Sequence, residues 1–480
     1  MNLFYKPTLA AAFLGLALIG CKAPMATKVN GQVKQAVPEH FQNESGLSQR
    51  NTGMTPWREF FTDKTLQGLI ETALANNQDL LKTYQEIEIA RSNVMYRSGR
   101  LSPEVSAGLG QGVRKAGRYT SEGAGDAGTQ IVPGKETPDP LFNTGGGLSM
   151  NWEVDIWHKL RTEKESAVAH YLSTVEGKNF ILSSLIAEVA DNYYELLALD
   201  NQLDIVHRYI EINERALEIS KILKQASAGT ELGVKKFEAE LAKSKAQEYM
   251  VKQSIAEKEN QINALLGRFP QSIERDKSGL VSAVPSAVYS GIPAQLLSNR
   301  PDIRAAEYEL KSAQLDVEAA RKEFYPSLGI SATLGLEAFK PNYLLKMPES
   351  LAYNLAGELA GPLINKSAIK ANFATADARQ LQALYEYDKT IINAYVEVAN
   401  LMSKIQNIGH YYELKSQETH ALEESIEVAN LLFKNSRADY LEVLMNNRDI
   451  LDAKMEMVEA KKNQLTAVTD IYKSLGGGWQ

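Results

Sequence analysis

The chain has 480 residues, and its 52 Lys and Arg against 59 Asp and Glu give a formal net charge of −7 at pH 7. This mildly acidic balance argues against a nucleic-acid partner, because binding a phosphate backbone takes a basic surface. Cys21 is the only cysteine, so the chain has no internal disulfide. Beyond the N-terminal region, no apolar run reaches the roughly 18 residues of a transmembrane helix.

Residues 1–20 have the features of a secretion signal. Lys6 supplies the positive charge, and Thr8–Ile19 is an apolar run that is too short to span a bilayer, which takes roughly 20 apolar residues. The sequence "LIGC" that ends at Cys21 resembles the lipobox of bacterial lipoproteins. This resemblance implies cleavage before Cys21 and attachment of lipid to its thiol and new amino terminus. The alternative is an ordinary cleavage site with a cysteine nearby by chance.

Residues 21–56 are polar, with scattered Gly, Pro and Asn, and are predicted to form a lipid-anchored N-terminal tether. Two or more acyl chains at one cysteine would hold such a tether stably in a bilayer. Lys22 stands where enterobacterial lipoproteins of the inner membrane carry Asp. By analogy, the outer membrane is therefore the expected location.

Long helices are predicted from residue 57 onward. Apolar residues recur every seven positions at Leu66, Ala73, Leu80, Ile87 and Val94, which predicts packing along a narrow coiled-coil stripe. Core helices of a globule are the alternative. A helix of 70 residues would extend roughly 105 Å, which no compact domain can contain. Further helical patterns rich in Ala, Leu, Glu, Lys and Gln cover about 157–227, 231–266, 298–324, 364–433 and 438–474.

Four segments instead alternate apolar residues with small or polar ones. They are 103–113, 146–157, 326–339 and 351–363. A period of two over about ten residues, with one apolar face, matches transmembrane β-strands better than strands of a sandwich. Four strands cannot close a barrel, because the smallest outer-membrane barrels have about 8, and open strand edges are not tolerated in lipid. Several copies of the chain must therefore share one barrel if these strands are transmembrane.

The order helix, strand, strand, long helix, helix occurs twice, which indicates an internal duplication. The first repeat covers 57–267 and the second covers 298–480. Residues 268–297 contain three prolines and form the predicted linker of the equatorial region. Between the first two strands, the glycine-rich residues 114–147 are predicted to form a long loop.

Several motifs together resemble the TolC-type outer-membrane efflux lipoproteins of the OprM/NodT branch. The likeness runs from about Trp57 to Trp479. Its motifs are "NWEVDIWHKLR" (151–161), "NRPDIRAAEYEL" (299–310), "KEFYPSLGISATLG" (322–335), "AGPLI" (360–364) and "LGGGW" (475–479).

This resemblance implies a homotrimer that is mainly α-helical and has a transmembrane β part. Each copy would give four strands to a 12-stranded barrel in the outer membrane, above a periplasmic tunnel of long coiled-coil helices. The resemblance also implies a passive exit duct for small molecules, which docks with a periplasmic adaptor protein and an inner-membrane transporter of the RND type.

The "RPDI" motif has a structural and a catalytic interpretation. As structure, it starts a helix, with Ser298 or Asn299 as the cap and Pro301 in the first turn, where a missing N–H is harmless. A catalytic pair of Arg300 and Asp302 is the alternative. The structural interpretation is favoured.

A closed tunnel needs turns at its periplasmic tip and groups that hold it shut. The two breaks between long helices, 224–234 and 433–443, fall at matching places in the two repeats. Tight turns favour Gly, Ser and Asn. The family implies contacts with the adaptor at these turns, which points to Ser227, Gly229, Asn435 and Ser436.

The periplasmic constriction is expected just inside the tip. Glu442 falls on a position that is aspartate in TolC, and Leu441 falls where OprM-like members narrow the lumen with an apolar side chain. Gly233 and Met445 stand where relatives often carry aspartate, so Glu442 is predicted to be the main charge of a weakened acidic ring, which attracts cations. The alternative is an ordinary solvated glutamate on a helix surface.

The sequence contains no motif for catalysis or cofactor binding. The six histidines show no metal-binding spacing, and no nucleophile elbow or phosphate-binding loop occurs. The chain is therefore predicted to be a non-enzyme without a cofactor. A lipid-anchored coiled-coil scaffold without a pore is the alternative from another class, and a type I protein-secretion duct would share the fold and differ in its partners.

Overall fold

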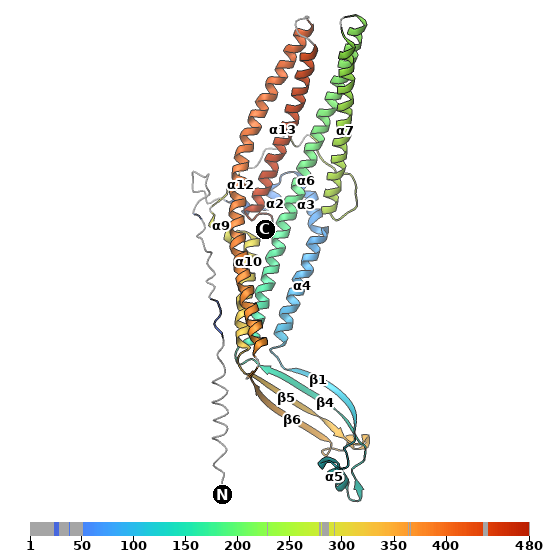
Figure 1. The fold of residues 1–480 in the computed structure, drawn as a ribbon, viewed down its shortest axis with the longest axis vertical. Coiled ribbons are helices and arrows are strands. Elements are labelled where there is room, and N and C mark those ends of the chain that lie inside the picture. Colours follow the sequence, from blue (N-terminus) through green and yellow to red (C-terminus); the bar gives the residue numbers. More distant parts are fainter. Residues whose placement is uncertain are drawn as a thin grey trace. The chain divides into compact units, whose positions relative to one another are not determined.

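The computed structural model describes residues 24–27, 38, 51–227, 229–277, 280, 288–291, 293–362, 364, 366–434 and 440–479, without the side chains of 132, 430, 433, 434, 440 and 441. The chain divides into two compact units, whose helices and strands are labelled in Figure 1. The first, here called the sheet unit, comprises Met1–Gly31, Glu88–Tyr171 and Tyr308–Leu384. The second, the helical unit, comprises Gln32–Ile87, Leu172–Glu307 and Tyr385–Gln480.

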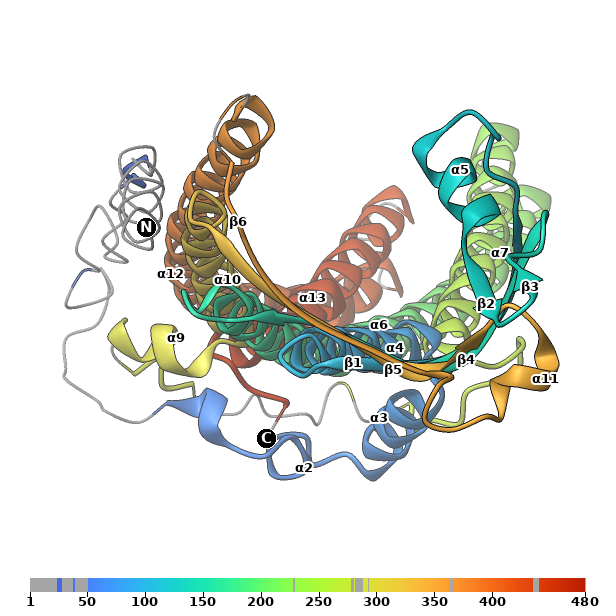
Figure 2. The ribbon, with the colours of Figure 1, turned by 90° about the horizontal axis from the view of Figure 1, so that it is seen from below.

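Four long strands form one antiparallel sheet in the sheet unit, and Figure 2 shows them as a curved band. Their order is β1-β4-β5-β6. Each strand overlaps one of the four alternating segments, so the prediction of four strands is confirmed. Their bounds are Glu104–Arg114 for β1, Leu141–Val154 for β4, Ser327–Ala338 for β5 and Leu351–Ala360 for β6.

The predicted loop over residues 114–147 is wrong in two respects. Its last residues belong to β4, because glycines 145–147 have no side chain to show an alternation but still pair through their backbone. The remainder also contains ordered elements, and the Thr120 hydroxyl caps a short helix by accepting a hydrogen bond from the Gly123 N–H (3.1 Å). These elements are α5 (Ser121–Gly128), β2 (Gln130–Val132) and β3 (Lys135–Glu136), and α11 (Pro341–Leu344) follows β5.

The predicted long helices are confirmed with small shifts at their ends. They are α6 (Lys159–Gln225), α7 (Glu231–Leu265), α10 (Pro301–Lys322), α12 (Ser367–Lys434) and α13 (Tyr440–Ser474). The shorter helical elements are η1 (Thr52–Met54), α2 (Trp57–Phe60), α3 (Lys64–Asn76), α4 (Gln78–Gly99) and α9 (Ala294–Asn299). No helix in the described part of the chain is both long and apolar enough to cross a bilayer.

The heptad stripe runs across a helix boundary that the pattern did not indicate. The Asn77 side chain accepts a hydrogen bond from the Leu80 N–H (3.0 Å) and donates one to the Leu265 carbonyl (3.0 Å), so it separates α3 from α4. Leu66, Ala73 and Leu80 of the stripe are buried, whereas Ile87 and Val94 are only half-buried. The narrow stripe is therefore fully packed only in its first part.

The core of the helical unit joins residues that lie far apart in the sequence. The rings of Phe60 on α2 and Tyr472 on α13 stack with centroids 4.0 Å apart. Tyr193 and Leu196 of α6 and Ile262 of α7 belong to the same buried cluster. Burial of each such side chain contributes roughly 1.5–3 kcal/mol to the free energy of folding. Packing between the two predicted repeats therefore holds this unit together.

The ends of the predicted tether and linker are packed. Gly53 is buried, and a Cβ there would lie 2.6 Å from the Leu475 carbonyl oxygen, so only glycine fits. In the linker, Arg275 forms an ion pair with Asp200 of α6 and donates to Glu259 of α7 (2.5 Å). Residues 51–56 and 268–277 thus belong to the helical unit and are more than connecting segments.

The start of α10 is partly as predicted. Pro301 is its first residue, as expected, but both predicted cap residues, Ser298 and Asn299, belong to α9. The buried Arg300 lies between the two helices and bonds to Asp302 (2.7 Å) and Glu397 (2.9 Å). Only Arg300 separates the two helices, and its ion pairs make it a structural residue.

Candidate functional site

The sheet has two chemically different faces. In the strand register, Glu104 lies opposite Asn151, Ser106 opposite Ser149, and Gly108 opposite Gly147, so small and polar residues share one face. The opposite face is apolar and exposed. Leu109 on β1 is 93% exposed, and Tyr353 and Leu355 on β6 are 78% and 75% exposed. An apolar outer face that is unburied within its own chain is typical of strands that face lipid.

The middle of the polar face is made mostly of glycine. Six of these glycines line a groove of about 500 Å³: Gly108, Gly110, Gly112, Gly145, Gly147 and Gly335. A Cβ at Gly147 would lie 2.4 Å from the Leu334 carbonyl oxygen, so a larger residue would force the strands to shift. This face is therefore a polar wall with few side chains projecting from it.

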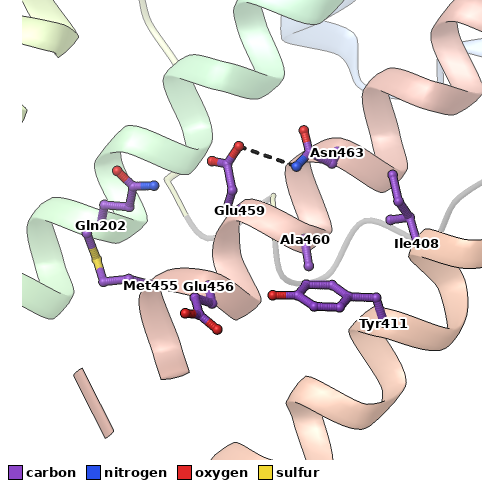
Figure 3. Close-up of a pocket in the computed structure, with 8 residues that line it drawn as sticks. All are labelled: Gln202, Ile408, Tyr411, Met455, Glu456, Glu459, Ala460 and Asn463. Carbon is purple, nitrogen blue, oxygen red and sulfur yellow. Dashed lines mark hydrogen bonds between the residues drawn. The ribbon is translucent and has the colours of Figure 1, made fainter. Parts of the chain in front are cut away.

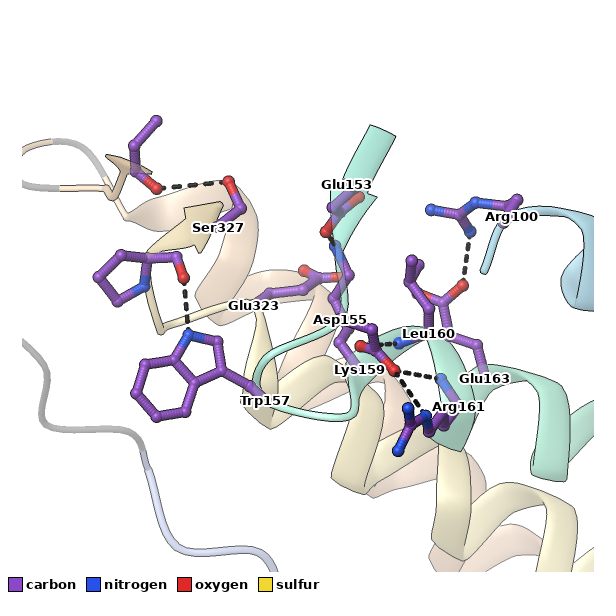
Figure 4. Close-up of polar contacts among 12 residues, drawn as sticks. Arg100, Glu153, Asp155, Trp157, Lys159, Leu160, Arg161, Glu163, Glu323 and Ser327 are labelled. Carbon is purple, nitrogen blue, oxygen red and sulfur yellow. Dashed lines mark hydrogen bonds and ion pairs between the residues drawn. The ribbon is translucent and has the colours of Figure 1, made fainter. Parts of the chain in front are cut away.

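The end of β4 joins α6 through a turn held by side chains (Figure 4). Asp155 accepts hydrogen bonds from the N–H groups of Leu160 (2.9 Å) and Arg161 (3.0 Å), which satisfies the first turn of α6. The Glu153 carboxylate bonds to Lys159 Nζ at 2.5 Å. A groove of about 850 Å³ at this end of the sheet is lined in part by Glu104, Asn151, Glu153, Ser331 and Glu358.

Aromatic side chains lie at the same end of the sheet. Trp157 donates its indole N–H to the Pro326 carbonyl (2.7 Å; Figure 4). The Trp157 ring also lies 5.3 Å from the ring of Tyr325, centroid to centroid. Trp152 donates to the Leu101 carbonyl (3.1 Å). Indole rings whose polar atom is satisfied suit the boundary between lipid and water, where Trp and Tyr gather.

The turn between α6 and α7 contains two of the predicted tip residues. Ser227 has a φ of 58° and donates its N–H to the Lys224 carbonyl (3.0 Å). A Cβ at Gly229 would lie 3.1 Å from the Lys224 nitrogen. Lys224 and Glu231 form an ion pair across the turn. Small residues occur in this turn because its backbone segments lie close together.

The other predicted site residues are described less fully. Glu442 lies exposed in the first turn of α13, where a carboxylate suits the positive end of the helix dipole. Leu441 belongs to the same turn, but its side chain is not described. Cys21, Asn435 and Ser436 lie outside the described residues.

Two grooves of the helical unit were not predicted from the sequence. One, of about 710 Å³, is lined by residues of α6, α12 and α13. They include the apolar or aromatic Tyr209, Ile212 and Val443 and the charged Arg215 and Glu427. Each helix alone shows only a mixed surface, so the groove depends on how the helices pack.

The second groove, of about 500 Å³, is shown in Figure 3. Gln202 comes from α6, Tyr411 from α12, and Glu459 and Asn463 from α13. The Asn463 amide donates to the Glu459 carboxylate at 3.3 Å. Two of the polar residues that line this groove are thus bonded to each other.

A pair of carboxyl groups lies between α6 and α13 in the helical unit. Burial, and then the negative charge of Asp470, raises the pKa of Asp191 to about 8, while Lys473 and Lys404 oppose the shift and Glu188 adds to it slightly. One carboxyl oxygen of Asp191 is buried and has no hydrogen-bond partner among the described residues. Among the described residues, no group of three or more His, Cys, Asp or Glu could hold a metal ion.

Comparisons with known proteins agree with the two-faced sheet and long helices. A family model described as outer membrane efflux protein matches residues 69–268 and 292–477. The pyoverdine export outer membrane protein OpmQ of Pseudomonas aeruginosa is 27% identical, over 88% of this chain and 87% of OpmQ. The toluene efflux pump outer membrane protein TtgF of Pseudomonas putida is 28% identical, over 90% of this chain and 87% of TtgF.

The fold also matches solved structures. The open state of the Neisseria gonorrhoeae MtrE outer membrane channel superimposes with a TM-score of 0.82 at 24% identity, covering 95% of this chain and 98% of that one. The chain therefore belongs to the outer membrane efflux protein family and is an outer-membrane channel protein of an efflux system.

Proposed function

We propose that three copies of this chain join edge to edge into a 12-stranded barrel and form the exit duct of a tripartite efflux system. The observation that carries the proposal is the sheet itself. Of the described strands, β1 pairs only with β4 and β6 pairs only with β5, so both sheet edges are open. Each unpaired backbone group in lipid costs several kcal/mol, and pairing between copies removes that cost.

The two faces of the sheet fit this assembly. Leu109, Tyr353 and Leu355 would face lipid, whereas the face with Gly108, Gly147 and Ser149 would line a water-filled lumen. A lumen wall rich in glycine leaves room for cargo and offers it few attachment points. Such a duct is passive, and the energy comes from an inner-membrane transporter of the RND type that acts through a periplasmic adaptor.

The duct is proposed to carry small molecules of differing polarity. OpmQ is named for pyoverdine export and TtgF for toluene efflux, so relatives of similar identity serve polar and apolar molecules alike. This range fits a duct whose partner transporter selects the cargo.

The duct is proposed to be anchored by lipid at Cys21, with residues 1–20 removed. The internal duplication divides the mature chain at the linker 268–297. At the periplasmic end, the turns with Ser227 and Gly229 and with Asn435 and Ser436 are proposed to contact the adaptor. The constriction is assigned to Leu441 and Glu442.

One experiment separates the duct from a scaffold without a pore. The full chain, expressed in a Gram-negative host and purified in detergent, is expected to migrate as a heat-modifiable trimer and to conduct ions in planar bilayers. A monomer without conductance would overturn the duct and favour the scaffold. Co-purification with a protein-secretion transporter instead of an RND transporter would indicate the type I secretion duct.

A further inference from the structure

The segment that follows the proposed lipid attachment site is bound on α12 through Thr27. Its backbone N–H donates to Asp377 Oδ1 (2.9 Å), and its hydroxyl donates to Asp377 Oδ2 (2.7 Å). Its carbonyl oxygen accepts from Gln380 Nε2 (3.1 Å). All three polar atoms of Thr27 are thus bonded to two residues that lie one turn apart on the helix.

Apolar contact accompanies these bonds. Ala26 packs against a buried cluster in which Phe324, just after α10, and Phe373 of α12 lie edge to face, with ring centroids 6.3 Å apart. The Gln380 side chain is only 4% exposed and points its amide at Thr27. A buried amide without a partner is costly, so Gln380 is suited to its surroundings only when the segment is in place.

The direction of the segment follows from the order of its contacts. Thr27 bonds to residues 377 and 380, whereas Ala26 packs against a cluster whose two members on α12, Phe373 and Ala376, both precede Asp377. The step from Thr27 back to Ala26 therefore points toward the N-terminal end of α12, where the sheet ends. Ile369 lines a groove with Trp157 and Tyr325, the aromatic residues at that end.

The number of residues between Cys21 and Thr27 is also sufficient for the lipid to reach that end of the sheet. Cys21 precedes Thr27 by six residues, which span at most about 20 Å when extended. The part of α12 between Ile369 and Asp377 rises by only about 12 Å. A lipid at Cys21 can therefore reach the aromatic end of the sheet while Thr27 stays bound.

We propose that Asp377 and Gln380 form a seat for Ala26–Thr27, and that this seat fixes the lipid-bearing end of the chain beside the aromatic end of the sheet. The role of the seat rests on the proposed lipidation of Cys21, whereas the contact itself does not. When Thr27 is bound in the seat, only residues 21–27 connect the lipid to the folded protein, instead of the whole tether 21–56.

Limited proteolysis tests the seat in the full-length protein. Trypsin cleaves after Lys28, directly beside Thr27, and also after Lys22. Mass spectrometry therefore follows the release of Ala23–Lys28 for the seat and the mass of Cys21–Lys22 for the lipid. Asp377→Ala removes both bonds to the carboxylate, so we expect cleavage roughly tenfold faster, as for the loss of hydrogen bonds to a charged group. The matched control is Glu386→Ala, which removes an exposed carboxylate of the same helix that pairs with Lys389 (3.3 Å) and should leave the rate unchanged.

A double mutant shows whether the effect runs through Thr27. Thr27→Val keeps the shape but loses the hydroxyl, and we expect it to speed cleavage less than Asp377→Ala and to add nothing to that variant. Equal rates for Asp377→Ala and the control, or independent effects in the double mutant, would overturn the seat. Asp377→Asn, which keeps the volume, replaces Asp377→Ala if that variant does not assemble.

The same spectra keep the two proposals apart. A peptide with an unmodified Cys21 but slow cleavage would remove the lipid anchor and leave the seat. A lipidated peptide whose cleavage does not respond to Asp377→Ala would remove the seat and leave the anchor.

Discussion

The sheet unit and the helical unit meet the same requirement, burial of apolar surface, in opposite ways. The helical unit buries Tyr193, Tyr472 and Leu196 inside one chain. The sheet exposes Leu109 and Leu355 and leaves both of its edges open. The helical unit is thus stabilised by contacts within this chain, whereas the sheet depends on surroundings that the chain itself does not supply.

The largest expected effect concerns the helical unit and tests whether packing within the chain stabilises it. Tyr472→Ala removes a ring that is 1% exposed, stacks on Phe60 and donates its hydroxyl proton to the Thr55 carbonyl (2.6 Å). We expect a loss of roughly 3–5 kcal/mol in the free energy of unfolding. Urea unfolding followed by the helical circular-dichroism signal measures it.

Tyr472→Phe is the control, because it keeps the ring and loses only one hydrogen bond, worth about 1 kcal/mol. If both variants lost the same stability, the packing of the ring would not be what holds the helical unit together.

The next prediction tests the dependence of the sheet on its surroundings. Leu355→Arg places a charge on the apolar face, and we expect it to destabilise the inserted sheet by roughly 2–4 kcal/mol and to lower the yield of heat-modifiable oligomer. Asn354→Arg, on the polar face of the same strand, is the matched control and should assemble normally. An equal yield for the two variants would contradict the assignment of the two faces.

A third prediction concerns pH and the helical unit. Because the pKa of Asp191 is raised from 3.8 to about 8, the folded state holds a proton between those values that the unfolded state has lost. The free energy of unfolding should therefore fall as the pH rises from about 4 to 8, and Asp191→Asn should reduce this fall.

The measurement is the urea midpoint of the wild type and the variant at several pH values from 4 to 9. Glu188→Gln, which removes an exposed neighbouring carboxylate, is the control and should keep most of the pH dependence. A wild type whose midpoint does not change over this range would exclude a strongly raised pKa.

The smallest expected effect is at the proposed constriction. Glu442→Ala removes the predicted charge, and we expect a change of less than about twofold in conductance in planar bilayers, with a weaker preference for cations. Lowering the salt concentration should enlarge the difference, because exposed charges are then less screened. Conductance and selectivity equal to the wild type at low salt would favour an ordinary surface glutamate.

Much of the fold could be predicted because its signals are local. The alternation in 326–339 and the helical period in 364–433 repeat over many residues, and Pro326 marks the boundary before β5. The motifs from "NWEVDIWHKLR" to "LGGGW" also indicated the family that the comparisons confirm. The prediction of a plain loop over 114–147 was wrong, because glycines carry no side chain from which a strand can be recognised.

The sequence by itself determined where the long helices and strands lie and which family the chain belongs to, since periodicity and motifs depend only on neighbours along the chain. Tertiary structure alone decided the break at Asn77, the packing of Arg275 against Asp200, and the seat of Thr27 on α12. Each of these depends on a partner that is distant in the sequence. A hydrogen bond or ion pair of this kind leaves no periodic mark on the residues around it.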